Sequence, residues 1–173
     1  MDTPAGNRYS LWLMPRGDAY ERLAPVLHEL SAACGAPEFP PHVTLLGGIV
    51  GARRDIVRQS AGLAERIRPF TIRLERIDYL DEYFRCLFVR AATTKPLREA
   101  HRIARGVFDH RREPAFMPHL SLLYGDFNRS TKEGLIARLG SRVNLELKVR
   151  SLHLYSTYGE PHHWRCIETF GLK

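Results

Sequence analysis

Two histidines occupy the same short motif at two points of the chain. The segment Pro41-His42-Val43-Thr44-Leu45-Leu46 returns 77 residues later as Pro118-His119-Leu120-Ser121-Leu122-Leu123. In a β-strand, residues i and i+2 lie on one face, so each histidine shares a face with a hydroxyl while the apolar residues point into a core. The proline before each histidine favours extended backbone at the strand entrance. The four polar residues are His42, Thr44, His119 and Ser121.

Two imidazoles that face one cleft suit a reaction in which one proton is removed and another is delivered. An imidazole titrates near neutral pH, so one histidine can act as base while the other acts as acid. Hydrolysis of a phosphodiester needs both, because water loses a proton as it attacks phosphorus and the leaving oxygen gains one. Thr44 and Ser121 would donate hydrogen bonds to the nonbridging oxygens, worth about 3 kcal/mol each. The alternative is that His42 and His119 are structural, half-buried and bonded to a neighbouring hydroxyl.

The elements that must hold these motifs repeat with nearly the same offset. Apolar periodicity predicts a strand, a helix, a histidine strand, a second helix and a further strand, followed by the same order again. The expected ranges are 9–14, 19–33, 41–46, 53–68 and 70–74, then 85–89, 96–108, 117–124, 130–139 and 145–149, with further strands at 152–154 and 164–170. This repeat predicts two lobes related by a pseudo-twofold axis, each giving one histidine strand to a shared cleft.

The composition is that of an ordinary globular protein with an excess of basic residues. Of the 173 residues, 44% are hydrophobic and 26% are charged, and the formal net charge is +7. This charge favours anionic partners such as phosphates, although a solvated basic surface without a role would give the same value. The polar first ten residues show no signal-peptide pattern, and no apolar stretch is long enough to span a membrane. We therefore expect a cytoplasmic protein without membrane contact.

The sequence indicates neither a metal nor a cofactor. The three cysteines, Cys34, Cys86 and Cys166, are too few for a disulfide framework and too scattered for a zinc site. A glycine-rich phosphate-binding loop is also missing from the sequence. The proposed chemistry therefore depends on side chains alone.

The paired motif resembles that of the two-histidine (2H) phosphoesterase superfamily, and within it the cyclic phosphodiesterases that act on ADP-ribose 1″,2″-cyclic phosphate and nucleoside 2′,3′-cyclic phosphates. The resemblance runs from residues 9–12 through 41–45, 83–88 and 117–124 to Trp164. It implies an α+β fold formed by residues 1–173 as a single bilobal domain, with two antiparallel sheets lining a central cleft and helices outside. It also implies metal-independent hydrolysis by His42, Thr44, His119 and Ser121, leaving the phosphate on the 2′ oxygen, with His119 as the base and His42 as the acid.

Three aromatic residues are candidates for substrate binding. Trp12 and Phe84 could stack on a base, although aromatic residues on strands also pack into cores. Strand alternation turns Tyr124 away from His119, but a turn at Gly125 could bring the ring back, and the resemblance favours contact with substrate.

The remaining histidines have structural or open interpretations. We expect His153 to be satisfied by a neighbour on its strand, and His162 and His163 to be solvated in a turn. The basic segment 110–112 could meet substrate phosphates or face water.

Three functions remain open at this point. The first is hydrolysis of a small cyclic nucleotide by a monomeric enzyme. The second is a phosphodiesterase or ligase-like activity on 2′-5′-linked RNA or on RNA ends, and the third is a non-catalytic nucleotide-binding module. Intact histidines in both motifs favour an enzyme, and the lack of an added basic arm favours a small substrate.

Overall fold

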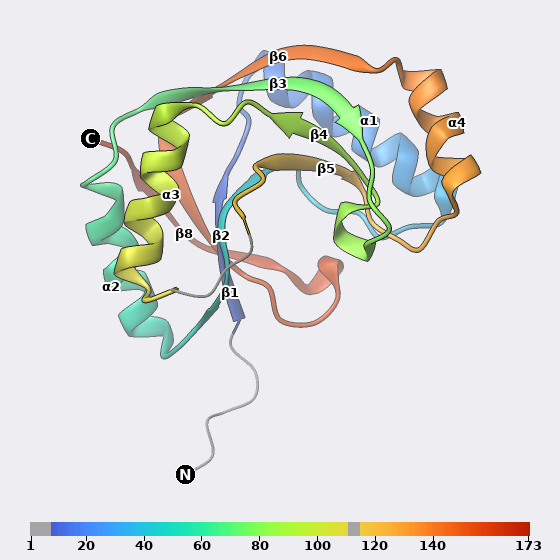
Figure 1. Ribbon diagram of the computed structural model, residues 1–173. Helices are drawn as coiled ribbons and strands as arrows, with labels where there is room; N and C mark the ends of the chain where they lie inside the picture. The colour runs from blue at the N-terminus through green and yellow to red at the C-terminus, as the bar shows by residue number, and fades with distance from the viewer. Residues whose placement is uncertain (1–7, 111–114) are drawn as a thin grey trace.

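Apolar residues with a period of two form the strands, and those with a period near 3.6 form the helices (Figure 1). The computed structural model describes residues 8–110 and 115–173. Within these ranges the elements are β1 (Arg8–Leu13), α1 (Asp18–Cys34), β2 (Val43–Val50), α2 (Arg53–Ala64), β3 (Phe70–Asp78), η1 (Tyr83–Arg85), β4 (Leu87–Ala91), α3 (Lys95–Val107), β5 (His119–Leu123), α4 (Arg129–Leu139), β6 (Arg142–Val149), β7 (Ser151–Ser156), η2 (Pro161–His163) and β8 (Arg165–Gly171), where η marks a 3-10 helix.

Several boundaries differ from those expected. The first histidine strand was expected to end before Gly47 and Gly48, but β2 continues to Val50. The pairing of β1 with β2 takes up the two glycines as an irregularity, and Gly48 has a φ of 65°. Such a bulge lets a strand continue where glycine supplies the left-handed conformation.

The strands form one antiparallel sheet in the order β6-β3-β4-β5-β2-β1-β7-β8. This order is symmetric about the boundary between β2 and β5 and places β4 and β1 at equivalent positions, as the repeat predicts. The repeat also equates β3 with β6, but these two strands pair with each other on one side of that boundary. The axis passes between β2 and β5, where Val43 pairs with Leu120. We expected two separate sheets, and this pairing joins them into a continuous one.

The lobes do not correspond to the two halves of the sequence. Strand β3, from the first half, pairs with β4 of the second half, while β7 pairs with β1. Each group of four strands on one side of the axis therefore contains strands from both halves. The internal repeat describes the order of elements correctly but not their distribution between lobes.

The helices lie outside the curved sheet, as expected, and they also cross between lobes. Helix α1, which precedes β2, packs against β5 and β6, and α3, which precedes β5, packs against β2. Helix α2 covers β7 and β8 and touches α3. Figure 1 shows α2 and α3 at one side of the molecule and α1 and α4 at the other.

The alternation within both histidine strands is present. Val43, Leu45, Leu120 and Leu122 are buried in the core, whereas the histidines and hydroxyl residues line a cavity. The core therefore fixes the face on which the polar residues appear. In the part of the chain that the structure describes, no helix combines the length and apolar character needed to cross a membrane.

Candidate active site

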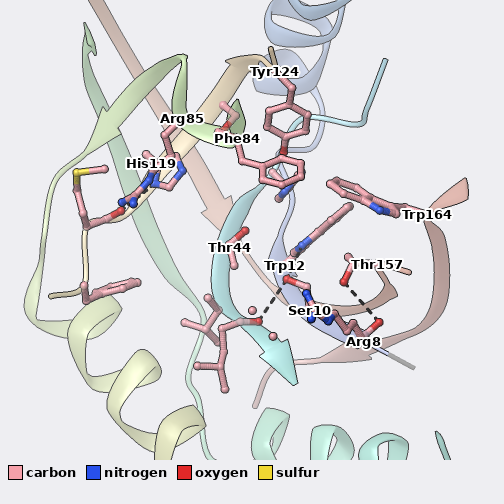
Figure 2. A pocket seen from close by; sticks show the side chains of 18 of the residues that line it. Arg8, Ser10, Trp12, Thr44, Phe84, Arg85, His119, Tyr124, Thr157 and Trp164 are labelled. Atoms are coloured by element: carbon pink, nitrogen blue, oxygen red, sulfur yellow. Dashed lines mark hydrogen bonds between the residues drawn. The ribbon is translucent and has the colours of Figure 1, made fainter. Parts of the chain in front are cut away.

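A cavity of about 890 Å³ extends across the junction of β2 and β5 (Figure 2). Because these strands are neighbours, polar residues far apart in the sequence face one space. The structure thereby brings together the seven residues that the sequence predicts as catalytic or substrate-binding, namely His42, Thr44, His119, Ser121, Trp12, Phe84 and Tyr124.

Both histidines are held by the same contact to the backbone. The Nδ1 atom of His42 lies 2.7 Å from the carbonyl oxygen of Pro40, and that of His119 lies 2.8 Å from the carbonyl oxygen of Met117. A carbonyl oxygen can only accept a hydrogen bond, so Nδ1 carries the proton in each neutral ring. Each imidazole is therefore left with Nε2 as the nitrogen available for proton transfer.

His42 lies in an aromatic environment. Only 5% of its surface is exposed, and its ring stacks on Trp12 with ring centroids 3.6 Å apart. Burial lowers the pKa of His42 to about 4, because the charged imidazolium loses solvation; the Pro40 carbonyl opposes this shift and the neighbouring His119 adds to it. At neutral pH, His42 is therefore uncharged in the free protein.

His119 lies in a more cationic environment and is only partly buried. Its ring meets the edge of Phe88 with centroids 5.1 Å apart. Burial is the main cause that lowers the pKa of His119, and the positive charges of Arg85 and Arg90 lower it further. The Met117 carbonyl and the negative charge of Glu82 oppose this shift. The charge of this histidine thus depends on neighbouring guanidinium groups as well as on burial.

The two motif hydroxyls are not equivalent. The Ser121 Oγ atom donates a hydrogen bond of 2.9 Å to the carbonyl oxygen of Phe84. Thr44 is partly exposed and lies opposite Trp12 in the pairing of β1 with β2. Ser121 has one proton and uses it on the backbone, so it would have to release Phe84 before it could donate to a substrate.

Both faces of Trp12 are covered. The indole is 1% exposed and stacks on His42 at 3.6 Å and on Tyr155 at 3.8 Å between centroids. Two nearly parallel rings this close to one indole must lie on opposite faces, so no face is left for a base. The expected stacking of Trp12 on substrate does not fit this geometry, and the packing alternative does. Its Nε1 atom donates to Ser10 Oγ at 2.8 Å, which holds the ring behind His42.

Tyr124 lines the cavity, as the resemblance implied, but for a different reason from the expected turn. The pairing of β4 with β5 has an irregularity between Leu87–Leu123 and Phe88–Ser121. An extra residue in a strand inverts the faces of the residues that follow it. Tyr124 therefore lies on the cavity side, where its ring stacks on Phe39 with centroids 3.7 Å apart.

Phe84 is the most accessible of the predicted aromatic residues. It is 52% exposed and meets Tyr124 edge-on at 5.1 Å and Trp164 at 6.1 Å between centroids. Figure 2 shows Phe84 and Trp164 facing the same space. Its exposed ring remains available for stacking on a base.

Two arginines of the cavity were missed in the sequence, Arg8 and Arg85. Residues 85–89 were expected to form an apolar strand, but β4 begins at Leu87 and Arg85 lies in η1. Glu82 holds the Arg85 guanidinium through a 2.7 Å hydrogen bond from Nε. The positive charge within the segment 83–88 was the available signal for Arg85, and it was overlooked because Arg85 was assigned to an apolar strand.

The other histidines have separate roles. The His153 ring nitrogens lie 3.0 Å from Ser151 Oγ and 3.1 Å from Thr169 Oγ1, which confirms that this ring is satisfied by neighbours. His162 and His163 lie exposed in η2, as expected. His101 lines the cavity and stacks on Phe116 at 3.8 Å, a contact that the sequence did not suggest.

Two further expectations concern the basic segment and metals. Within 110–112, Arg111 and Arg112 lie outside the described residues. Across residues 8–110 and 115–173, no group of three or more His, Cys, Asp or Glu side chains is arranged to hold a metal ion.

Comparison with known proteins places this arrangement in a family. Residues 18–161 match the model of the 2′-5′ RNA ligase superfamily, which comprises 2H phosphoesterases. The chain is 25% identical over 125 residues to a cyclic phosphodiesterase of Arabidopsis thaliana, covering 72% of this chain and 69% of that protein.

Solved structures share the fold over nearly the full length. LigT of E. coli in its apo form has a TM-score of 0.70 at 17% identity, covering 97% of this chain and 98% of LigT. The protein TT0787 of Thermus thermophilus has a TM-score of 0.69 at 20% identity, covering 95% of this chain and 97% of that one. LigT has also been solved with 3′-AMP, with a TM-score of 0.69 at 16% identity over 97% of this chain and 99% of LigT.

These matches confirm the superfamily indicated by the two histidine motifs. Since the family model spans most of the sequence and includes both motifs, this chain belongs to the 2′-5′ RNA ligase superfamily.

Proposed function

We propose that this protein is an enzyme that hydrolyses a cyclic phosphodiester of a nucleotide, such as a nucleoside 2′,3′-cyclic phosphate or ADP-ribose 1″,2″-cyclic phosphate. The observation that carries this proposal is the pair of imidazoles in one cavity, each bound through Nδ1 to a backbone carbonyl. The cyclic phosphodiesterase of Arabidopsis supports the same reaction class. A module that only binds nucleotides has no need of two proton-transfer groups.

In the proposed mechanism, the two Nε2 atoms act on opposite sides of the phosphorus. His119 takes a proton from the attacking water, and His42 gives a proton to the leaving oxygen. The bond from phosphorus to water forms while the bond to the 3′ oxygen breaks. A 2′,3′-cyclic phosphate thereby opens to a 2′-phosphate and a free 3′ hydroxyl.

The depressed pKa of His42 places a condition on this assignment. In the free protein the pKa of His42 is about 4, so its imidazole is not an acid at neutral pH. The negative charge of a bound phosphate favours the imidazolium and raises this pKa. Substrate binding is therefore expected to bring a proton onto His42.

The rest of the cavity accounts for binding of phosphate and base. Arg8 and Arg85 supply positive charge to the cavity, and we assign the Thr44 hydroxyl, which also lines it, as the donor to a nonbridging oxygen. The exposed ring of Phe84 is suited to stack on the base of the substrate.

The experiment that tests this proposal is incubation of the purified protein with 2′,3′-cyclic mononucleotides, ADP-ribose cyclic phosphate and 2′-5′-linked oligomers. We expect phosphorus NMR to show a 2′-phosphate as the product of the cyclic mononucleotides. The His42→Ala/His119→Ala variant from the same purification is the control for contaminating enzymes. Hydrolysis of the 2′-5′ oligomers alone, or a 3′-phosphate product, would contradict the proposal.

Chelation tests the independence from metals. Because the chemistry uses imidazoles as both acid and base, we expect turnover to survive EDTA. Loss of turnover in EDTA and its return with a divalent cation would contradict the two-histidine mechanism.

A further inference from the structure

Lys132 is a buried lysine outside the candidate active site. It lies near the start of α4, and only 1% of its surface is exposed, although a lysine is rarely buried so fully. The residue does not line the cavity that holds the two histidines. An ammonium group is costly to remove from water, so the contacts that it makes, rather than packing, explain its place here.

The ammonium group holds the start of the connection between β3 and β4. Nζ of Lys132 donates to the Leu80 carbonyl oxygen at 3.1 Å and to Asp81 Oδ1 at 2.5 Å, and it lies 5.0 Å from the centroid of the Tyr79 ring. The hydrogen bond from Lys132 lowers the pKa of the Asp81 carboxyl, so this partner is ionised at neutral pH. One lysine thus contacts three consecutive residues of the connection.

A second set of contacts links α4 to the same connection. Glu133 Oε1 accepts a hydrogen bond of 2.9 Å from the Tyr79 hydroxyl and one of 2.7 Å from Arg129 Nε. These groups are exposed to solvent, where such pairs contribute little to stability. The buried side chain of Lys132 is therefore the stronger anchor.

The anchored residues are bound in turn to Arg85. The Leu80 N–H group donates to the Arg85 carbonyl oxygen at 2.9 Å, so Leu80 contacts both Lys132 and Arg85. The Arg85 N–H group donates to the Glu82 carbonyl oxygen at 3.0 Å, and its guanidinium binds the Glu82 carboxylate. Residues 80–82 thus lie between α4 and an arginine of the active site.

The middle of the connection is held from the opposite side, by β5 and the residues that follow it. Ser121 Oγ donates to the Phe84 carbonyl oxygen at 2.9 Å, and the Gly125 N–H group donates to the Tyr83 carbonyl oxygen at 3.0 Å. Together with α4, these contacts hold the connection at two points. It therefore presents Phe84 and Arg85 to the cavity in one arrangement (Figure 2).

From this arrangement we propose that Lys132 is a positioning residue of the active site, which fixes Arg85 and Phe84 through its contacts with residues 79–81. The inference rests on the proposed function, in which Arg85 supplies charge for the phosphate and Phe84 stacks on the base. Because Lys132 acts through these two residues, its loss weakens binding and leaves both proton transfers in place.

The test removes the ammonium group and measures binding of adenosine 2′-phosphate, the product expected from adenosine 2′,3′-cyclic phosphate. Lys132→Met keeps an apolar stem of similar length. It should raise the Kd of the product and the KM of the cyclic phosphate by about 3–30-fold, while kcat changes little. Lys148→Met removes the same charge from an exposed position on β6 and is the control that should keep the wild-type Kd.

A double-mutant cycle shows whether Lys132 acts through the residues named. In a Phe84→Ala/Arg85→Ala background, Lys132→Met should cause no further rise in Kd, because the groups that it positions are already absent. An equal rise in Kd in both backgrounds would overturn the inference, since a general loss of stability would act in either one.

A second variant breaks the same contact without changing the buried side chain. The Asp81 side chain is 91% exposed, so Asp81→Lys leaves the core intact and places a like charge beside the ammonium group. We expect the Kd of the product to rise in this variant too. The added positive charge alone would favour phosphate binding, so weaker binding would report displacement of the connection.

The outcomes separate this inference from the function on which it rests. An unchanged Kd in Asp81→Lys, or in Lys132→Met that is folded by circular dichroism, would overturn the role of Lys132, as would a loss confined to kcat. Failure of the wild-type protein to hydrolyse the cyclic phosphate would instead overturn the proposed function. The Kd values would still test the positioning role in that case, because binding of the product requires no turnover.

Discussion

The His42 and His119 sides of the site share one backbone arrangement and differ in what surrounds it. In both, Nδ1 binds the carbonyl oxygen two residues upstream. His42 is covered by the indole of Trp12, whereas His119 has two guanidinium groups nearby. The repeated motif thus fixes the same tautomer for both histidines. The residues around them are not repeated, and these residues give the two imidazoles different pKa values.

This difference shows how a symmetric scaffold can support an asymmetric reaction. A base and an acid must hold different protonation states at the same pH, which two identical environments cannot provide. Deeper burial makes His42 the harder of the two to protonate in the free protein, so its role as the acid depends on the proton that the bound phosphate is expected to bring onto it. Because the two sites interact, their titration belongs to the pair rather than to either ring.

The largest effects are expected from removing the imidazoles. His42→Ala and His119→Ala should each lower kcat on a 2′,3′-cyclic nucleotide by about 10²–10⁴-fold, since each removes one proton transfer. The double variant should be little worse than either single one, because the two groups act as a unit. His163→Ala, an exposed histidine in η2, is the control and should keep wild-type turnover. Near-normal turnover in either active-site variant would indicate that the substituted histidine has a structural role and no role in proton transfer.

The next effect concerns stability in acid. The unfolded chain protonates His42 around the ordinary histidine pKa of 6.5, whereas the folded protein does so only near 4. The unfolded state therefore binds more protons in this window, and the free energy of unfolding falls as the pH falls, by about 3 kcal/mol for this group. Denaturant unfolding from pH 7 to pH 4 should show this loss in the wild-type protein.

His42→Gln provides the comparison, since glutamine does not titrate. The variant should lose less stability than the wild-type protein over the same range, whatever its stability at pH 7. His119 and His153 remain and contribute in the same direction, because burial lowers their pKa values too. Parallel curves for the two proteins would show that His42 is not the buried, uncharged group described here.

The smallest effects should separate the two hydroxyls. Ser121→Ala removes a hydrogen bond to the Phe84 carbonyl, so it should raise KM about tenfold by loosening the segment that carries Phe84. Thr44→Ala should lower kcat instead. The effects of Ser121→Ala and Phe84→Ala on KM should be less than additive in the double variant, because both substitutions act through one contact. Full additivity, or a loss confined to kcat in Ser121→Ala, would make Ser121 equivalent to Thr44.

Local sequence patterns predicted much of the fold and of the site. The alternation in the two motifs correctly placed Val43 and Leu120 in the core and the polar residues in one cavity, because a buried face fixes strand orientation. The order of helices and strands also followed from apolar periodicity.

The features that escaped prediction depend on pairing between distant segments. The exchange of β3 and β7 between lobes leaves no trace in local periodicity, and neither does the joining of the sheets at Val43 and Leu120. The irregularity in β5 that turns Tyr124 to the cavity is set by its pairing with β4. Trp12 was recognisable as an aromatic strand residue, but its stacking partners His42 and Tyr155 come from other strands.

The most direct test of different roles for His42 and His119 is to measure how the turnover of each alanine variant depends on the leaving group of the substrate. A p-nitrophenyl phosphodiester has a leaving group that needs no proton, so loss of the acid should matter little for it. We expect His42→Ala to recover to within about tenfold of wild-type turnover on this substrate, while His119→Ala keeps its loss of about 10²-fold or more. Recovery of His119→Ala instead would reverse the roles of acid and base, and equal losses in both variants would contradict proton transfer by two distinct histidines.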